Sequence, residues 1–121
     1  MEKKKTLVIG ASTNPERFSY KAIKLLRKYE HPVVAVGIKE GEIDEISILK
    51  NKPTNIDIDT VTMYVGPKNQ PEYYQYILDL KPKRIIFNPG TENEVFEKMA
   101  KDIGIEVVED CTLVMLNGGI F

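Results

Sequence analysis

Two short apolar runs with an amphipathic stretch between them constrain the fold of this chain more than any other feature. The runs are Thr6–Ile9, which Gly10 closes, and Pro32–Val36, which Gly37 closes. Continuous runs of this kind are typical of strands that are buried on both faces of a sheet. Across residues 17–29 the apolar positions instead recur at helical spacing. This order predicts a strand, a helix and a second, parallel strand joined by a right-handed crossover.

The same alternation continues through the rest of the chain. Thr91 and Glu94 have the spacing of a capping box, and Gly104 closes the helix that they open. Ile46–Leu49 predicts a short edge strand in the least readable part of the chain. Further strands are predicted at residues 60–65, 84–87 and 105–108, and further helices at residues 71–80 and 91–103. We therefore expect an α/β fold with an open, mostly parallel sheet of about five strands and helices on both faces.

Length and charge limit the kinds of partner. At 121 residues the chain has the size of one domain, which we place at residues 1–121. Its 17 basic and 18 acidic residues give a net charge of -1. We therefore expect no nucleic acid and no membrane as a partner, because the chain has no overall field that attracts a polyanion. Its single cysteine and the absence of a signal-peptide pattern favour a reducing, cytoplasmic setting.

Few side chains suit catalysis or metal binding. His31 is the only histidine, which excludes multi-histidine metal sites, and because we expect it to be a turn residue we predict no His-based triad. Cys111 has no recognisable base partner, so we expect a small buried hydrophobic side chain and not a nucleophile. We therefore predict no catalytic residue and no metal ligand.

The segment that follows the first strand carries the candidate ligand site, because open sheets of this class bind ligands outside the carboxyl ends of their strands. Gly10 permits a tight turn, and small residues let backbone amides approach a phosphate. The next helix has two candidate caps, Asn14 with Pro15, or Ser19. We expect Ser19, because it leaves a longer loop that can fold over a ligand. The candidate binding residues here are Gly10, Ala11, Ser12, Thr13, Asn14, Arg17, Phe18, Ser19, Tyr20 and Lys21.

The ends of the other strands narrow the choice of nucleotide. The dinucleotide fingerprint has three spaced glycines, and Ser12 and Pro15 occupy the places of the second and third. A NAD site normally has an acid near the end of the second strand, whereas Lys39 stands there and suits a ribose phosphate. Both observations disfavour NAD. The candidate binding residues at these strand ends are Gly37, Lys39, Val65, Gly66, Pro67, Asn88, Pro89 and Gly90.

A family resemblance adds to this interpretation. Residues 8–12, followed by Pro15, Arg17 and residues 19–21, resemble the signature of the small stand-alone CoA-binding domain family, which is related to the N-terminal domain of the succinyl-CoA synthetase α-subunit. The similarity spans almost the whole chain. It implies a Rossmann-like fold that binds coenzyme A, and it implies no established reaction. It also implies that Gly10, Ala11, Ser12 and Arg17 lie near the phosphates and Lys39 near the adenosine end.

Three hypotheses follow. The first is a protein that binds coenzyme A, or an acyl-CoA, as a nucleotide-like small molecule and has no catalysis of its own. The second is an enzyme that uses NADP or a CoA thioester. The third is an interaction domain whose apolar C-terminal segment, Leu113–Leu116 with Ile120 and Phe121, packs on a partner or forms a homodimer.

Overall fold

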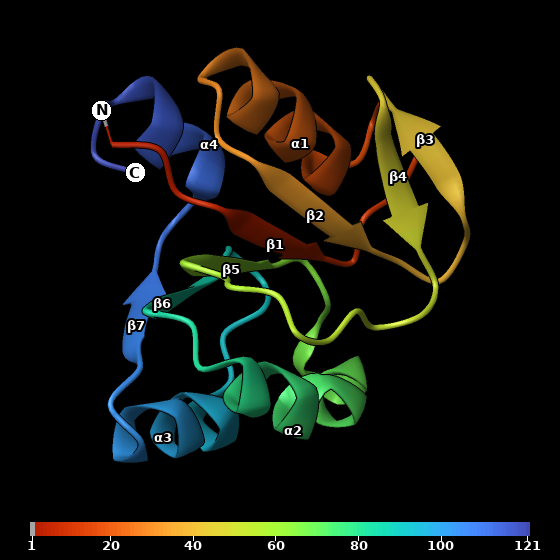
Figure 1. The fold of residues 1–121 in the computed structure, drawn as a ribbon. Helices are drawn as coiled ribbons and strands as arrows, with labels where there is room; N and C mark the ends of the chain where they lie inside the picture. Colours follow the sequence, from red (N-terminus) through yellow and green to blue (C-terminus); the bar gives the residue numbers. More distant parts are fainter. Residues whose placement is uncertain (1) are drawn as a thin grey trace.

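A seven-stranded sheet lies at the centre of residues 2–121, which are the residues that the computed structural model describes (Figure 1). The strands are β1 (Thr6–Ile9), β2 (Val33–Val36), β3 (Gly41–Ile43), β4 (Ile46–Leu49), β5 (Thr60–Met63), β6 (Arg84–Phe87) and β7 (Glu106–Glu109). Their spatial order is β3-β4-β2-β1-β5-β6-β7. Every neighbouring pair is parallel except β3 with β4.

Helices cover both faces of this sheet. They are α1 (Phe18–Lys28), α2 (Pro71–Leu80), α3 (Glu94–Asp102) and α4 (Thr112–Asn117), with a 3-10 turn, η1 (Pro67–Asn69), before α2. Figure 1 shows α1 and α4 on one face and α2 and α3 on the other. The helix α1 joins β1 to β2, whereas α2 and α3 lead through β6 to β7 in the opposite direction across the sheet. Right-handed crossovers in opposite directions place their helices on opposite faces.

Two apolar clusters hold the layers together, one on each face of the sheet. Successive side chains of a strand point to opposite faces, so Leu7 and Val8 belong to different clusters. The cluster beneath α2 and α3 includes Leu7, Val61, Phe87, Ile77 and Phe96. The cluster beneath α1 and α4 includes Val8, Ile86, Ile23, Leu26 and Met115. The predicted α/β fold, with a mostly parallel sheet and helices on both faces, is confirmed.

The sheet has more strands than the sequence predicted, because β3 was missed. Only Ile43 of its three residues is buried, so its apolar pattern is too short to recognise. It pairs antiparallel with β4 through a turn at Asp44 and Glu45, whose φ angles of 45° and 72° are both left-handed, as a two-residue type I′ turn requires. Since β3 takes the outer position, Ile46–Leu49 is an inner strand and not the edge strand that we expected.

The first helix begins earlier than predicted. Arg17 occupies its N-cap and Phe18 is its first residue, so the expectation that Ser19 caps this helix is wrong. Ser19 instead lies inside the helix and is buried. The preceding turn is braced locally, because the amide of Arg17 donates to the carbonyl of Asn14 at 3.0 Å.

The predicted capping box of the third helix is also displaced. Its cap is Asn93, whose side chain accepts the amide of Phe96, while the Glu97 carboxylate accepts the amide of Asn93. The Thr91 hydroxyl donates to the carbonyl of Asn88 instead. Thr91 and Glu94 therefore do not cap α3, and the reciprocal pair that does so begins two residues later and consists of Asn93 and Glu97.

The C-terminal segment folds back onto its own chain. Met115, Leu116 and Phe121 are buried in the cluster beneath α1 and α4. Val114 and Ile120 remain exposed and are the large apolar side chains left for the expected homodimer contact. Cys111, which we expected to be buried, stands at the N-cap of α4 and is only partly buried. No helix in residues 2–121 has both the length and the apolar character needed to cross a membrane.

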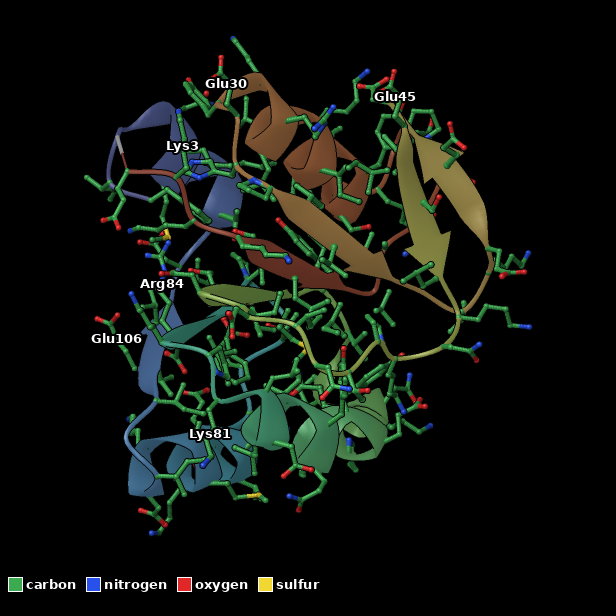
Figure 2. All side chains as sticks on the ribbon, in the orientation of Figure 1. Lys3, Glu30, Glu45, Lys81, Arg84 and Glu106 are labelled. Atoms are coloured by element: carbon green, nitrogen blue, oxygen red, sulfur yellow. The ribbon has the colours of Figure 1, made fainter. Side chains whose placement is uncertain are left out.

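Basic and aromatic side chains close the amino ends of the strands. His31 is 1% exposed, and its Nδ1 accepts the amide of Lys4 at 2.9 Å. The ring of Phe121 packs on His31 and on the Arg84 guanidinium, with centroid distances of 4.9 and 4.5 Å. Figure 2 shows Arg84 and Lys3 on this side of the molecule. Burial, together with the charges of Lys3, Lys4 and Arg84, lowers the pKa of His31.

We expect His31→Asn to reduce the acid sensitivity of the fold. The folded pKa of His31 lies below the unfolded value of about 6.5, so stability is lost as the pH falls through that value and the unfolded chain takes up a proton. Asparagine keeps an acceptor for the Lys4 amide but does not titrate. Thermal unfolding at about pH 7.5 and about pH 5.5 should show a larger drop for the parent chain. Equal drops would exclude His31 as the cause.

Candidate functional site

A cavity opens at the carboxyl ends of the parallel strands, where the strand order reverses between β1 and β5. Open α/β sheets bind ligands at such a switch point. Its volume is about 1130 Å³, slightly above the usual range of roughly 300–1,000 Å³ for small-molecule sites. It is lined by Gly10, Ala11, Ser12, Thr13, Asn14, Glu16, Arg17, Phe18, Ser19, Ile38, Lys39, Tyr64, Val65, Gly66, Asn69, Glu72, Tyr73, Pro89, Gly90 and Thr91.

The turn after β1 is fixed by the end of β2. The amides of Gly10 and Ala11 both donate to the carbonyl of Val36, at 2.9 and 3.0 Å. Gly10 and Ala11 therefore do not offer their amides to an anion, although both belong to the turn that was predicted to do so. Gly10 has a φ of 95°, and a Cβ there would lie 3.0 Å from the backbone of Tyr64. Only glycine meets both requirements.

The amino end of α1 offers amides that the turn does not. No side chain caps this helix and its first turn contains no acid. The first amides of a helix have no partner within the helix, and they carry the positive end of its dipole. Arg17, Phe18 and Ser19 line the cavity at this point. The combination of free amides and a guanidinium suits a phosphate.

The end of β2 contributes one structural residue and two that line the cavity. The amide of Gly37 donates to the carbonyl of Leu49, and a Cβ at Gly37 would overlap the carbonyl oxygen of Ala11. Gly37 therefore permits the turns after β1 and β2 to touch. The next two residues, Ile38 and Lys39, line the cavity, and Ile38 is 80% exposed. They offer an apolar surface and a cation beside each other.

The turns after β5 and β6 form the opposite wall of the cavity. Val65, Gly66, Pro89 and Gly90 line it. Asn88, which we predicted to contact the ligand, is 2% exposed. Its amide nitrogen donates to the Thr62 hydroxyl and the Met63 carbonyl, while its oxygen accepts the amide of Thr112. Asn88 therefore ties together the ends of β5 and β6 and the start of α4.

Most of the predicted binding residues lie together at this cavity, but five do not line it. Tyr20 and Lys21 line a separate groove on the outer side of α1, next to Leu113. Gly37, Pro67 and Asn88 are not lining residues. The sequence prediction missed Glu16, Ile38, Tyr64, Asn69, Glu72, Tyr73 and Thr91. All seven follow a strand within the next few residues or begin the helix after it, so the strand-end rule could have found them.

The lining combines two cationic side chains, Arg17 and Lys39, and two acidic ones, Glu16 and Glu72, with residues that carry no charge. Tyr64 lines the cavity, but its hydroxyl oxygen is itself buried, and this burial raises the pKa of its phenol. Within residues 2–121 no group of three or more acidic, histidine or cysteine side chains is arranged to hold a metal ion.

The fold is that of a Rossmann-like α/β protein, and its cavity lies at the topological switch point of the sheet. The CoA binding domain family matches residues 4–117. The chain therefore belongs to this family of CoA binding domains. No curated protein matches the sequence.

Solved structures of the same fold are also similar to this chain. The crystal structure of an uncharacterized protein is 48% identical, covers the whole of both chains and superposes with a TM-score of 0.96. Cell-free ID.343 from Thermus thermophilus is 23% identical over 98% of this chain and 91% of its own, with a TM-score of 0.87. A hypothetical protein from Pyrococcus horikoshii OT3 is 24% identical over 98% of this chain and 84% of its own, also with a TM-score of 0.87. The last two similarities concern the fold alone.

Gly37→Ala should destabilise the fold through the contact between the two turns. The added methyl group would overlap the Ala11 carbonyl, which is backbone and cannot swing aside. Overpacking of this kind costs about 1–3 kcal/mol of unfolding free energy. Gly66→Ala is the matched control, because its φ is -64° and no heavy atom lies within 4 Å of the new Cβ. Urea denaturation of both variants checks this, and equal stabilities would contradict it.

Proposed function

We propose that this chain binds coenzyme A or an acyl-CoA in the strand-end cavity. The observation that carries the proposal is the open amino end of α1, with no side-chain cap and no acid in its first turn, in a member of the CoA binding domain family. Free amides and the positive end of a helix dipole attract an anion. The family suggests the ligand, and the residues suggest where its phosphates lie.

We assign the diphosphate and the ribose 3′-phosphate of the ligand to two different cationic side chains. Arg17 lines the cavity at the start of α1, and Lys39 lines it beyond the end of β2. We place the diphosphate at α1 with Arg17, and the ribose 3′-phosphate beside Lys39. Ser12 supports the first placement, because its Oγ accepts the amide of Asn14 at 3.1 Å and its own O–H is left to donate.

The uncharged pantetheine arm then lies along the turns after β5 and β6. Gly66 and Gly90 have no side chains, and no heavy atom stands within 4 Å of the position that a Cβ would take at either residue. Val65 and Pro89 offer apolar contact beside them. A thin, flexible arm fits this wall better than a second nucleotide does.

We further propose that binding is not coupled to a reaction within this chain. Among the described residues that line the cavity, none is a histidine or a cysteine, so the usual general base and thiol nucleophile are not at hand there. The alternative is an enzyme that uses NADP or a CoA thioester. It requires turnover in a panel of NADPH and acyl-CoA assays, and loss of that turnover in Arg17→Ala.

Two further proposals concern the oligomeric state of the protein and its location in the cell. Val114 and Ile120 are 62% and 64% exposed at the C-terminal segment, which supports a homodimer contact there. The single, only partly buried cysteine suits a reducing, cytoplasmic setting.

Arg17→Ala should weaken the binding of coenzyme A about tenfold or more, because a hydrogen bond to a charged group is worth roughly 1.5–3 kcal/mol. Lys21→Ala is the matched control. It removes the same charge from the same helix, but its side chain lines the outer groove and not the cavity. The affinity of the Lys21→Ala variant for coenzyme A should stay within about twofold of that of the parent chain.

Isothermal titration with coenzyme A measures both variants, and a thermal shift of the parent chain checks binding itself. At a ligand concentration of about 100 times Kd the shift corresponds to roughly 2.7 kcal/mol of stabilisation. If coenzyme A does not stabilise the parent chain at any concentration, the proposed function is wrong. Equal losses in the two variants would remove Arg17 from the phosphate site.

Lys39→Ala should abolish discrimination between coenzyme A and dephospho-CoA. In the parent chain coenzyme A should bind more tightly, because only it carries the ribose phosphate that we place beside Lys39. Lys50→Ala is a suitable control, since Lys50 follows β4, the parallel neighbour of β2, but does not line the cavity. Titrations with both ligands decide the matter. Equal affinities in the parent chain would reject this role for Lys39.

A further inference from the structure

A single buried amide connects the two turns that form one wall of the cavity. Gln70 is 0% exposed and stands between η1 and α2. Its Nε2 donates to the carbonyl of Val65 at 2.8 Å and to the carbonyl of Thr91 at 2.7 Å. Val65 follows β5 and Thr91 follows β6, so one side chain links the ends of two neighbouring strands.

The other half of this amide is held as firmly. Gln70 Oε1 accepts from Asn93 Nδ2 at 2.9 Å, and the same Nδ2 donates to the Tyr74 hydroxyl at 2.7 Å. Asn93 is itself fixed as the cap of α3. Both donors of the Gln70 amide and one lone pair of its oxygen are therefore in use, and a buried amide so satisfied has one preferred orientation.

Gln70 supports the cavity wall without being part of it. Val65 and Thr91 line the cavity, as do the glycines next to them, Gly66 and Gly90, whereas Gln70 does not. Glycine-containing turns lose much conformational freedom when they become ordered. Because the hydrogen bonds of Gln70 already order these turns in the free protein, ligand binding does not have to offset the entropy cost of ordering them.

We infer that Gln70 is a positioning residue for the pantetheine end of the ligand. This inference rests on the proposed function, which places the phosphates at α1 and Lys39 and leaves the turns after β5 and β6 for the pantetheine arm. Gln70 acts through the carbonyls of Val65 and Thr91 and holds the two turns at a fixed separation. It has no part in binding the adenosine and phosphate half.

Gln70→Met tests the inference by keeping the length of the side chain and removing its hydrogen bonds. The ligands to compare are coenzyme A and adenosine 3′,5′-bisphosphate, which lacks the pantetheine arm. We expect coenzyme A to bind about tenfold more weakly to the variant, with the affinity for the bisphosphate unchanged within about twofold. Gln75→Met is the matched control, because Gln75 lies on the exposed side of α2 and contacts only Asp79 through its amide. It should change neither affinity.

Equal losses for both ligands would overturn the inference, because they would indicate a general loss of structure. Unchanged binding of coenzyme A would overturn it as well. If the parent chain binds neither ligand, the proposed function itself fails, which is a separate outcome. If Gln70→Met does not fold, Tyr74→Phe decides: it removes one acceptor from Asn93 and keeps the ring stacked on Phe96 at 4.4 Å. It should reduce the affinity for coenzyme A alone, by a smaller factor, and no selective reduction would overturn the inference.

Discussion

The contact between the turns after β1 and β2 is the constraint on which the cavity depends. One carbonyl, that of Val36, accepts the amides of both Gly10 and Ala11, and Gly37 lets the Ala11 carbonyl pass where a side chain would stand. These bonds direct the chain away from the sheet and into the loop that leads to α1. The start of α1 is thereby brought to the switch point of the sheet, where Arg17, Phe18 and Ser19 line the cavity. The two glycines make this approach possible.

Much of the fold could be predicted from the sequence because the apolar patterns are strong where the elements are buried. The helix Pro71–Leu80 and the strand Arg84–Phe87 were predicted with the bounds that the structure has. The missed strand β3 has one buried residue in three, and it owes its place to pairing with β4 and to the turn at Asp44 and Glu45. An edge strand of this kind is specified by its partner and its turn more than by its own pattern.

The position of the candidate site could be predicted from the sequence, but the separate roles of its residues could not. The rule that ligands lie beyond the strand ends led to turns that line the cavity. It did not indicate that the side chain of Asn88 is engaged in three hydrogen bonds, or that Lys21 lies on the outer side of α1. Gln70 has no sequence signal at all, since its role exists only once β5, β6 and α3 are assembled. Roles that depend on tertiary hydrogen bonds are not visible in local patterns.

The charges around the cavity explain why an anion would select one helix end among three. The helices α1, α2 and α3 all begin on the side of the sheet where the strands end. The start of α3 is closed by Asn93 and Glu97, and Glu92 accepts the amide of Gly90.

Several acidic side chains lie near the start of α3. A hydrogen bond with Glu97 and the charge of Glu97 raise the pKa of Glu109 there. The start of α2 has Glu72 in its first turn. Of the starts of α1, α2 and α3, only that of α1 combines the absence of a side-chain cap with the absence of an acid in its first turn, and Arg17 stands beside it. The phosphates of the proposed ligand would then be attracted by the local field of the start of α1 and Arg17 and not by the net charge of -1, with Glu16 as a neighbouring acid that also lines the cavity.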